Sequence, residues 1–560
     1  MKTQLGLLAP YVNRRLDWHG QNRTINRLFD HDITLWGGTG APGEEIANRL
    51  DWLGLPTESS TLIPDLEAVY QELLDEGYNT AVLLGMGGSS LAPFVTSSIQ
   101  QGFSARPSKA LQLIVLDSTS PDQIQTVCDS IELPKTVFII SSKSGTTSET
   151  KALADFFWQY TVKSGEETPG RHFMAVTDPG SMVVEDSRQK QYRAIFEANP
   201  EVGGRFSALT TFGLLPTSLL GINLEDYLGA AQKAAMQCGP STPAQENPGL
   251  FLGTVLAEAA SLGMDKAIIL ADPEVASFGV WAEQLVAESS GKNGVGIIPV
   301  AQEPVFSPDT YSPDRVFVYL RSSGRLDPLV ETLAESNRPH LTFDFSQVDD
   351  LAAQFYIWEV AIAVACTQLG VNAFNQPNVQ ETKTLTKTKL ERLRQTGSLG
   401  LPAPQFEDEG IEVRWDNPTG LPLQNLPEII QAFLAQIQPG DYLAVNAFLP
   451  DTVENQQLLT NLRFNITSRT GVVTTSGFGP RYLHSTGQLH KGGKNSGLFL
   501  VLTKDSSSQL EIPEEAIQFK QFILAQAAGD IEALTSRGRR VLHIHFKDPH
   551  RLPALNELFG

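Results

Sequence analysis

Cysteine and long apolar runs are scarce in this chain of 560 residues. Its three cysteines, Cys128, Cys238 and Cys366, lie far apart, and their spacing matches neither a disulfide framework nor a zinc site. No apolar run reaches the length that spans a bilayer, and the apolar stretch after Lys2 is too short for a signal peptide. These absences predict a protein of the reducing cytoplasm without a membrane segment.

Basic charge is also in short supply. Lys and Arg number 42 against 63 Asp and Glu, which gives a net charge of −21 at pH 7. A field of that sign repels nucleic acids and anionic membranes, so we expect neither as a partner. It also repels phosphorylated metabolites, so a phosphate site in this chain needs its own local donors and cations.

Short apolar runs alternate with helix-like segments, which is typical of parallel sheets covered by helices on both faces. The first group of predicted strands is 81–84, 113–116, 137–140 and 173–176, with helices at 64–76, 89–101, 121–131 and 149–162. A second group has strands at 267–270, 315–320 and 340–345 and a long buried helix at 350–369. A third has strands at 442–445, 498–502 and 541–546 and helices at 424–437, 453–466 and 514–537. We expect a helical arm at 1–60 and α/β units at 61–235, 236–395 and 396–560.

A glycine-rich turn follows the first predicted strand, at 85–90 (GMGGSS). Glycines allow a sharp turn that leaves backbone N–H groups exposed, and the following helix adds partial positive charge at its N-terminus. The spacing fits neither an ATP-binding loop nor a dinucleotide-binding fingerprint. A tight strand–helix turn without a ligand explains this loop equally well.

A hydroxyl-rich turn follows the third predicted strand, at 141–150 (SSKSGTTSET). It holds more hydroxyls than a helix N-cap requires, and both loops leave the carboxyl ends of strands in one sheet, where such sheets bind ligands. We predict a phosphate cradle of Ser142, Ser144 and Thr147, with Lys143 as a nearby cation and Glu149 facing the same region. The alternative is a hydroxyl-rich surface turn.

In this order, the two loops resemble the sugar-isomerase (SIS) domains of the glucose-6-phosphate isomerase family. Three more segments extend the resemblance: 203–207 (GGRFS), 281–292 (WAEQLVAESSGK) and 375–383 (NQPNVQETK). A C-terminal segment, 479–493 (GPRYLHSTGQLHKGG), is similar to the isomerase half of bacterial transaldolase–glucose-6-phosphate isomerase fusions, whose transaldolase barrel fits nowhere in this chain. The resemblance implies two SIS-type doubly wound parallel-sheet domains, followed by a third, C-terminal α/β domain.

The resemblance also implies an activity: interconversion of glucose 6-phosphate and fructose 6-phosphate through a cis-enediol, in glycolysis and gluconeogenesis, with no metal or organic cofactor. Glu288 matches the family's base, Arg205 the arginine that stabilises the enediolate, and Lys383 the lysine that assists ring opening. Positions that match the substrate site are Gly88, Ser89, Ser142, Lys143, Ser144, Thr147, Glu149 and Gly204. Without the motifs, Glu288 and Lys292 read as a surface i,i+4 pair, Arg205 as a partner of Glu201, and Lys383 as a solvated side chain.

One position departs from the family pattern. The family uses a histidine between its base and its lysine, but here the only histidine in that interval is His340, at the start of a predicted strand. Gln354 falls near the expected place, and an amide cannot exchange a proton. Our hypothesis is that His484 or His490, in the C-terminal unit, replaces that histidine, since imidazole titrates in the needed range; the alternative is that both make structural hydrogen bonds. His543 and His545 alternate on an apolar strand, which favours a structural role over metal binding.

Three readings of function follow. The first is an aldose–ketose isomerase acting on hexose 6-phosphates, the second a catalytically silent phosphosugar-binding or regulatory protein, and the third a dual phosphoglucose/phosphomannose isomerase. Glu288, Arg205 and Lys383 argue against the silent binder, because binding alone needs no base. The family completes its site across a subunit interface, so we also expect a homodimer or a higher homo-oligomer.

Overall fold

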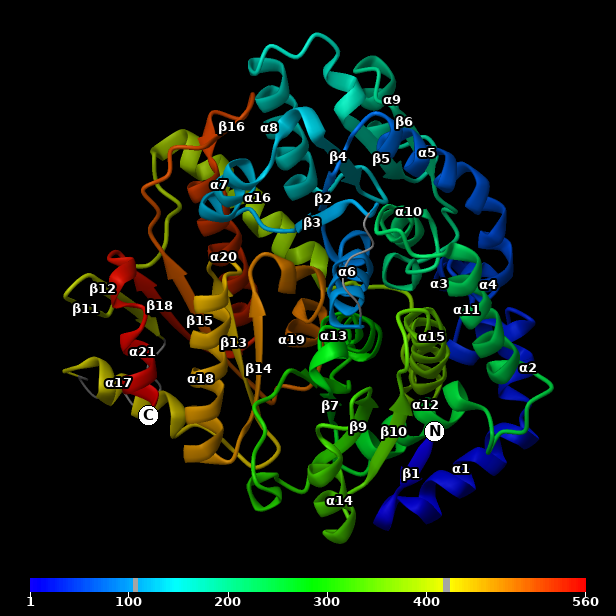
Figure 1. The fold of residues 1–560 in the computed structure, drawn as a ribbon. Helices are drawn as coiled ribbons and strands as arrows, with labels where there is room; N and C mark the ends of the chain where they lie inside the picture. Colours follow the sequence, from blue (N-terminus) through cyan, green and yellow to red (C-terminus); the bar gives the residue numbers. More distant parts are fainter. Residues whose placement is uncertain (104–108, 416–423) are drawn as a thin grey trace.

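The computed structural model describes residues 1–103, 109–415 and 424–560. Three sheets, each flanked by helices, form the body of the molecule (Figure 1). We call the three sheets and their helices the first, second and third units, in chain order. The α/β architecture predicted from the alternating apolar runs is confirmed.

The first unit is a parallel sheet of order β3-β2-β4-β5-β6. Its strands are β2 (Thr80–Gly85), β3 (Gln112–Leu116), β4 (Thr136–Ser141), β5 (Phe173–Thr177) and β6 (Ala194–Glu197). Its helices are α5 (Ile63–Asp75), α6 (Leu91–Phe103), α7 (Pro121–Ser130), α8 (Ser148–Lys163), α9 (Met182–Gln189) and α10 (Thr211–Leu219). All four predicted strands are present. The short, half-exposed edge strand β6 and helices α9 and α10 were not predicted.

The second unit has the order β8-β7-β9-β10-β1. Strands β7 (Lys266–Ala271), β8 (Ile298–Ala301), β9 (Arg315–Arg321) and β10 (His340–Asp344) are parallel, and β1 (Lys2–Gln4) adds an antiparallel edge. Its helices are α11 (Leu224–Cys238), α12 (Pro248–Ser261), α13 (Phe278–Ser290), α14 (Asp327–Glu335) and α15 (Asp350–Leu369). The N-terminal arm is mostly helical, with α1 (Ala9–Gln21), α2 (Thr24–Phe29), α3 (Gly40–Ala47) and α4 (Leu55–Glu58), but it begins with strand β1.

The third unit has the order β11-β12-β18-β15-β13-β14. Its strands are β11 (Phe406–Asp408), β12 (Ile411–Trp415), β13 (Tyr442–Phe448), β14 (Val473–Phe478), β15 (Gly497–Lys504) and β18 (Arg540–Phe546), with a separate hairpin of β16 (Glu511–Ile512) and β17 (Ile517–Gln518). Its helices are α17 (Leu426–Leu434), α18 (Val453–Thr470), α19 (Gly487–Gly492), α20 (Phe519–Ser536) and α21 (Ala554–Phe559). Helix α16 (Val379–Thr396) links the second unit to the third and packs on α20.

The parallel strands of all three sheets follow one winding order. In each unit the first strand along the chain lies between the second and the third, and the fourth lies outside the third: β3-β2-β4-β5, β8-β7-β9-β10 and β14-β13-β15-β18. Such a sheet has its topological switch point beside its first strand, which is where ligands bind in open α/β sheets. The third unit is therefore built like the other two, although no sequence repeat reveals it.

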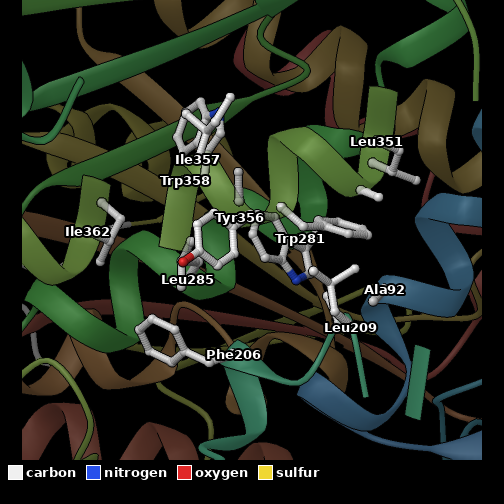
Figure 2. Packing of buried hydrophobic residues seen from close by; sticks show 14 of the residues in the cluster. Ala92, Phe206, Leu209, Trp281, Leu285, Leu351, Tyr356, Ile357, Trp358 and Ile362 are labelled. Atoms are coloured by element: carbon white, nitrogen blue, oxygen red, sulfur yellow. The ribbon is translucent and has the colours of Figure 1, made fainter. Parts of the chain in front are cut away.

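Helix α15 lies in the middle of the apolar core. It is the single helix of the described residues that is long and apolar enough to cross a membrane, yet 83% of its apolar window is buried inside the molecule. Trp281 and Leu285 of α13 and Phe206 of the first unit pack beside its aromatic residues (Figure 2). The core thus joins the first and second units, and α15 is a core helix, as its sequence predicts.

The third unit is tied to the first by polar contacts. The Arg481 guanidinium donates to both carboxylate oxygens of Asp117, at 2.7 and 2.8 Å, and to Asp451 at 2.7 Å. Thr119 in the first unit donates to the Gln526 side chain on α20 at 2.6 Å. These contacts hold the segment after β14, with its histidine His484, against the carboxyl ends of the first unit's strands.

Candidate active site

The two predicted phosphate loops lie side by side. Gly85, the last residue of β2, pairs with Ser141, the last residue of β4, so both loops start from adjacent points of one sheet edge. In the second loop, the Ser142 hydroxyl is buried and has no hydrogen-bond partner among the described residues. The hydroxyl oxygens of Ser144 and Thr146 lie 2.8 Å apart, and Thr147 precedes α8 without capping it through its side chain. The Ser142 hydroxyl is therefore available to an anion near the N-terminus of α8, whereas the Ser144 and Thr146 hydroxyls bond one another.

Lys143 is not among the free groups of this loop. Its ammonium donates to both oxygens of Asp178, at 2.7 and 2.8 Å, and to the backbone carbonyl of Asn199 at 3.3 Å. Burial lowers the pKa of Lys143, although the Asp178 carboxylate opposes this. The described contacts give Lys143 the role of fixing the loop to Asp178.

Glycine at positions 87 and 88 lets the first loop approach two other segments closely. Gly87 has a φ of +56°, and a Cβ there would lie 2.9 Å from both the Gln284 amide nitrogen and the His484 carbonyl. A Cβ at Gly88 would lie 2.0 Å from the Gly204 carbonyl oxygen, closer than any side chain allows. The first loop therefore packs directly on the glycine–arginine turn and on the segment that carries His484.

The predicted base and the predicted arginine meet in a buried pair. An Arg205 Nη1–Glu288 Oε2 distance of 3.3 Å joins side chains that are only 4% and 9% exposed. The same guanidinium donates to the Ser289 hydroxyl at 2.8 Å, to the Ala373 carbonyl at 2.6 Å and to Gln376 Oε1 at 3.1 Å. Burial lowers the pKa of Arg205, and the Glu288 carboxylate opposes that shift. A fully hydrogen-bonded guanidinium is held rigidly beside the carboxylate, which excludes the pairing of Arg205 with Glu201 and a surface position for Glu288.

Lys292, one turn after Glu288, is buried in the same region. Its ammonium donates to the Asn372 carbonyl. Burial, together with the positive charge of Arg205, lowers the pKa of Lys292 to about 7. The surface i,i+4 pair is thus also wrong for Lys292, which lies past the end of α13 and is buried.

His484 reaches the site from the third unit. Its Nε2 lies 2.9 Å from Glu149 Oε1, and its backbone carbonyl accepts a hydrogen bond from Gln284 at 2.8 Å. Gln284 also donates to Glu288 Oε2 at 3.2 Å, so one amide side chain bridges the predicted base and the His484 segment. Burial would raise the pKa of Glu149, but the charge and the hydrogen bond of His484 outweigh it and lower this pKa to about 2.

The structure does not bring two other predicted residues to this cluster. His490 is fully buried in the third unit, where its ring packs on Tyr442, Tyr482 and Phe499, and burial places its pKa well below the usual range. Lys383 is exposed on α16, and its side chain forms no ion pair within residues 109–415 and 424–560. Of the two candidate histidines, only His484 contacts a predicted site residue.

Several residues of the cluster went unnoticed at the sequence level. Gln284 and Gln376 lie inside segments that matched the family but carry no titratable group, and Gln526 gave no signal in its helix. Gln526 donates to Glu149 Oε1 at 2.8 Å, beside the bond from His484. Gln354 is buried in α15, and its Oε1 has no partner in the described part of the chain.

The first and second units are wound parallel sheets. Hydroxyl-rich loops follow the carboxyl ends of the strands, and a buried carboxylate–guanidinium pair lies beside them. This arrangement has the fold class of phosphosugar isomerases. Residues 76–298 match the family model described as phosphoglucose isomerase. The curated glucose-6-phosphate isomerase of Methanocaldococcus jannaschii is 25% identical over 362 residues, which cover 57% of this chain and 87% of that protein. The chain is therefore similar to glucose-6-phosphate isomerases, and these matches support an isomerase enzyme.

Solved structures agree in fold. A hypothetical protein from Thermus thermophilus matches with a TM-score of 0.57 and 23% identity, covering 70% of this chain and all of that chain. A glucose-6-phosphate isomerase from Chlamydia trachomatis matches with a TM-score of 0.52 and 19% identity, covering 65% of this chain and 78% of that chain. The resemblance of residues 479–493 to the isomerase half of the transaldolase fusions stays a prediction.

Proposed function

We propose that this protein interconverts glucose 6-phosphate and fructose 6-phosphate through a cis-enediol, with Glu288 as the base. The observation that carries the proposal is the buried Glu288–Arg205 pair at 3.3 Å, which the glycine loop at 87–88 and the Gly204 turn bring beside the hydroxyl loop. The resemblance to glucose-6-phosphate isomerases supplies the substrate, and the acidic surface of the molecule explains why its phosphate needs a dedicated cradle.

In this proposal the phosphate binds to the second loop. The hydroxyls of Ser142, Ser144 and Thr147 and the backbone N–H groups before α8 donate to its oxygens, with Ser89 and Gly88 on the neighbouring loop. A helix N-terminus favours such an anion without any cation in direct contact. The unpartnered Ser142 hydroxyl supports this assignment.

The proton transfer then lies between Glu288 and the two carbons of the sugar. The carboxylate removes the proton from C2 of the open-chain aldose, and negative charge develops on the C1 oxygen. The C1 oxygen then takes up a proton while the C2 hydroxyl gives one up, and the same carboxyl returns its proton to C1 to give the ketose. Arg205 stabilises the enediolate because its guanidinium stays charged and is held in place by four hydrogen-bonded neighbours.

Ring opening falls to His484 in this scheme. The imidazole gives a proton to the ring oxygen while the C1–O bond of the cyclic form opens, and the anomeric hydroxyl passes its proton to water as it becomes the carbonyl. Glu149, whose Oε1 lies 2.9 Å from His484 Nε2, orients the ring. We give His490 and Lys383 no catalytic role, since neither contacts this cluster.

The test of the base is Glu288→Gln, assayed by coupling glucose 6-phosphate formation to its oxidation, with EDTA present. We expect kcat to fall at least about 10³-fold, because the amide keeps the shape of the site but cannot accept the proton. Glu283→Gln is the matched control, since Glu283 is a buried carboxyl on the same helix that contacts the Ala301 N–H instead of the cluster. Substrate binding without turnover in the unmodified protein would support the silent phosphosugar binder instead.

The test of the histidine is His484→Gln, measured on two substrates. Turnover of cyclic hexose phosphate should fall about 10²-fold or more, the usual contribution of a general acid. Exchange of the C2 proton of erythrose 4-phosphate with deuterated water should fall far less, because this sugar phosphate cannot close a ring through its phosphorylated oxygen. Equal losses on both substrates would mean that His484 acts in enolisation or in folding and not in ring opening.

A further inference from the structure

A cavity opens in the third unit, and none of its lining residues belongs to the Glu288 cluster. It has a volume of about 470 Å³ and lies between the segment 400–405, strands β12 and β18, and one face of α20. Its walls are largely apolar, formed by Leu401, Pro402, Trp415, Ala528, Ile531 and Val541. This volume is in the range of small-molecule sites, and apolar walls with a few polar groups are typical of them.

Two polar side chains of this cavity, Arg414 and His543, each have one nitrogen without a hydrogen-bond partner among the described residues. Arg414 on β12 and His543 on β18 face each other as a register pair of the antiparallel strands. Arg414 Nη1 and His543 Nδ1 are both buried, and neither has a partner among the residues that the structure describes. A buried polar nitrogen without a partner is unfavourable, and here two occur on side chains of register partners.

The rest of both side chains is firmly held. Arg414 donates through Nε to the Pro402 carbonyl at 2.8 Å and through Nη2 to Glu412 at 2.6 Å. His543 Nε2 lies 2.8 Å from the Thr503 hydroxyl. The two nitrogen atoms without partners are therefore fixed in position.

A smaller cavity of about 80 Å³ adjoins the larger one. The two share Leu401, Arg414, Ala528 and His543, and the smaller one adds the polar residues Glu412, Thr503 and His545. The polar inner part has room for a small head group, and the outer part has room for an apolar body. An amphiphilic ligand fits this division better than a sugar, which would leave its hydroxyls against apolar walls.

Charges around the cavity set the sign of that head group. Arg414 and Lys389 are the cations, but Lys389 is paired with Glu532 at 2.6 Å and Arg414 has one pair with Glu412. The donor left over is Nη1 of Arg414, which suits one negative charge, whereas the nearby carboxylates of Glu412 and Glu532 oppose a doubly charged group.

We propose that this cavity binds a small organic carboxylate with a flat apolar body, its carboxylate on Arg414 and His543 and its body against Trp415 and Ile531. Helix α20 connects this site to the Glu288 cluster: Ala528, Ile531 and Glu532 face the cavity, and Gln526 of the same helix donates to Glu149. The cavity therefore lies beside a helix that also reaches the Glu288 cluster (α20 in Figure 1), but the two sites share no lining residue.

The test uses benzoate as the probe, with isothermal titration calorimetry on the intact protein. We expect saturable binding of one benzoate per chain, unaffected by fructose 6-phosphate at the other site. Benzyl alcohol, with the same body and no charge, should bind at least about tenfold more weakly, the loss expected when a charged hydrogen bond is removed. The measurement needs no turnover, so its outcome is independent of the proposed isomerase reaction.

Substitutions in the cavity test whether benzoate binds there. Arg414→Gln should weaken benzoate binding at least about tenfold, while Arg188→Gln, on the exposed surface of the first unit, should leave it unchanged. Leu401→Trp, which fills the cavity from a loop without touching an ion pair, should abolish binding even if Arg414→Gln fails to fold. Absence of saturable binding, binding that survives both variants, or binding of inorganic phosphate in preference to benzoate would each overturn the proposal.

Discussion

Glu283 is a buried carboxyl whose protonation depends on pH near neutrality. It lies on α13, where its Oε1 accepts a hydrogen bond from the Ala301 N–H at 3.1 Å, and burial raises its pKa to about 7 even though that bond and Arg463 oppose the shift. Between pH 4.5, its value in an unfolded chain, and pH 7, the folded state holds a proton that the unfolded state has lost. Stability therefore decreases as the pH rises through this window, by about 3 kcal/mol in total.

Replacing Glu283 with Gln should remove this dependence. An amide keeps the hydrogen bond from the Ala301 N–H and carries no charge, so we expect a higher Tm than the unmodified protein at pH 8 and a similar Tm near pH 4.5. Thermal unfolding followed by circular dichroism at both pH values measures the difference. An equal difference at the two pH values would show that the carboxyl is ionised in the folded protein throughout.

At the level of single residues, the sequence pointed to Glu288 and Arg205 but not to most of their contacts. Glu288 and Arg205 lie in motifs whose residue types are needed for enolisation, and the structure pairs them. The choice between His484 and His490 was open, because six residues along a short turn and helix decide which side chain faces the first unit and which faces the core. Gln526 could not be predicted, since an amide that orients a carboxylate carries no signal of its own in a sequence.

At the level of elements, burial decided which strands could be predicted. Strands β2, β4 and β9 are apolar runs buried on both faces, and their sequences predict them directly. Strand β8 contains Pro299 and β14 contains two threonines and a serine, so neither reads as a buried strand. Strand β12 was missed as well, although it forms one wall of the cavity in the third unit.

A prediction at the level of elements concerns the glycine loop that follows β2. Gly88→Ala would bring a methyl group to within 2.0 Å of the Gly204 carbonyl, so the loop and the arginine turn must separate. We expect a loss of about 1–3 kcal/mol in stability and a larger loss in activity, because Arg205 follows that turn directly. Chemical denaturation and the coupled assay measure the two effects.

Gly229 is the matched control for this substitution. It lies inside α11, and a Cβ there meets nothing within 4 Å. Gly229→Ala should therefore stabilise the protein by up to about 1 kcal/mol and leave activity unchanged. If both variants behaved alike, close approach at Gly88 would not be the cause.

At the level of the whole molecule, three units with one winding order make a single body. The third unit shares an apolar cluster with the second, which includes Phe317 and Tyr319 of β9 and Phe499 and Val501 of β15. Because His484 and Gln526 come from this third unit, the cluster around Glu149 is complete within one chain. The expected homo-oligomer stays a prediction, which a mass measurement in solution can test.

The contact between Arg481 and Asp117 joins residues 364 positions apart, and Glu149 and Gln526 are 377 positions apart. Contacts of such long sequence separation form late when a chain folds, since a large loop must close before they contribute any stability. Each sheet, by contrast, is built largely from segments close together in the chain. After dilution from denaturant, circular dichroism should therefore recover first and isomerase activity last, with a delay that Asp117→Asn lengthens; simultaneous recovery would mean that the units dock as they form.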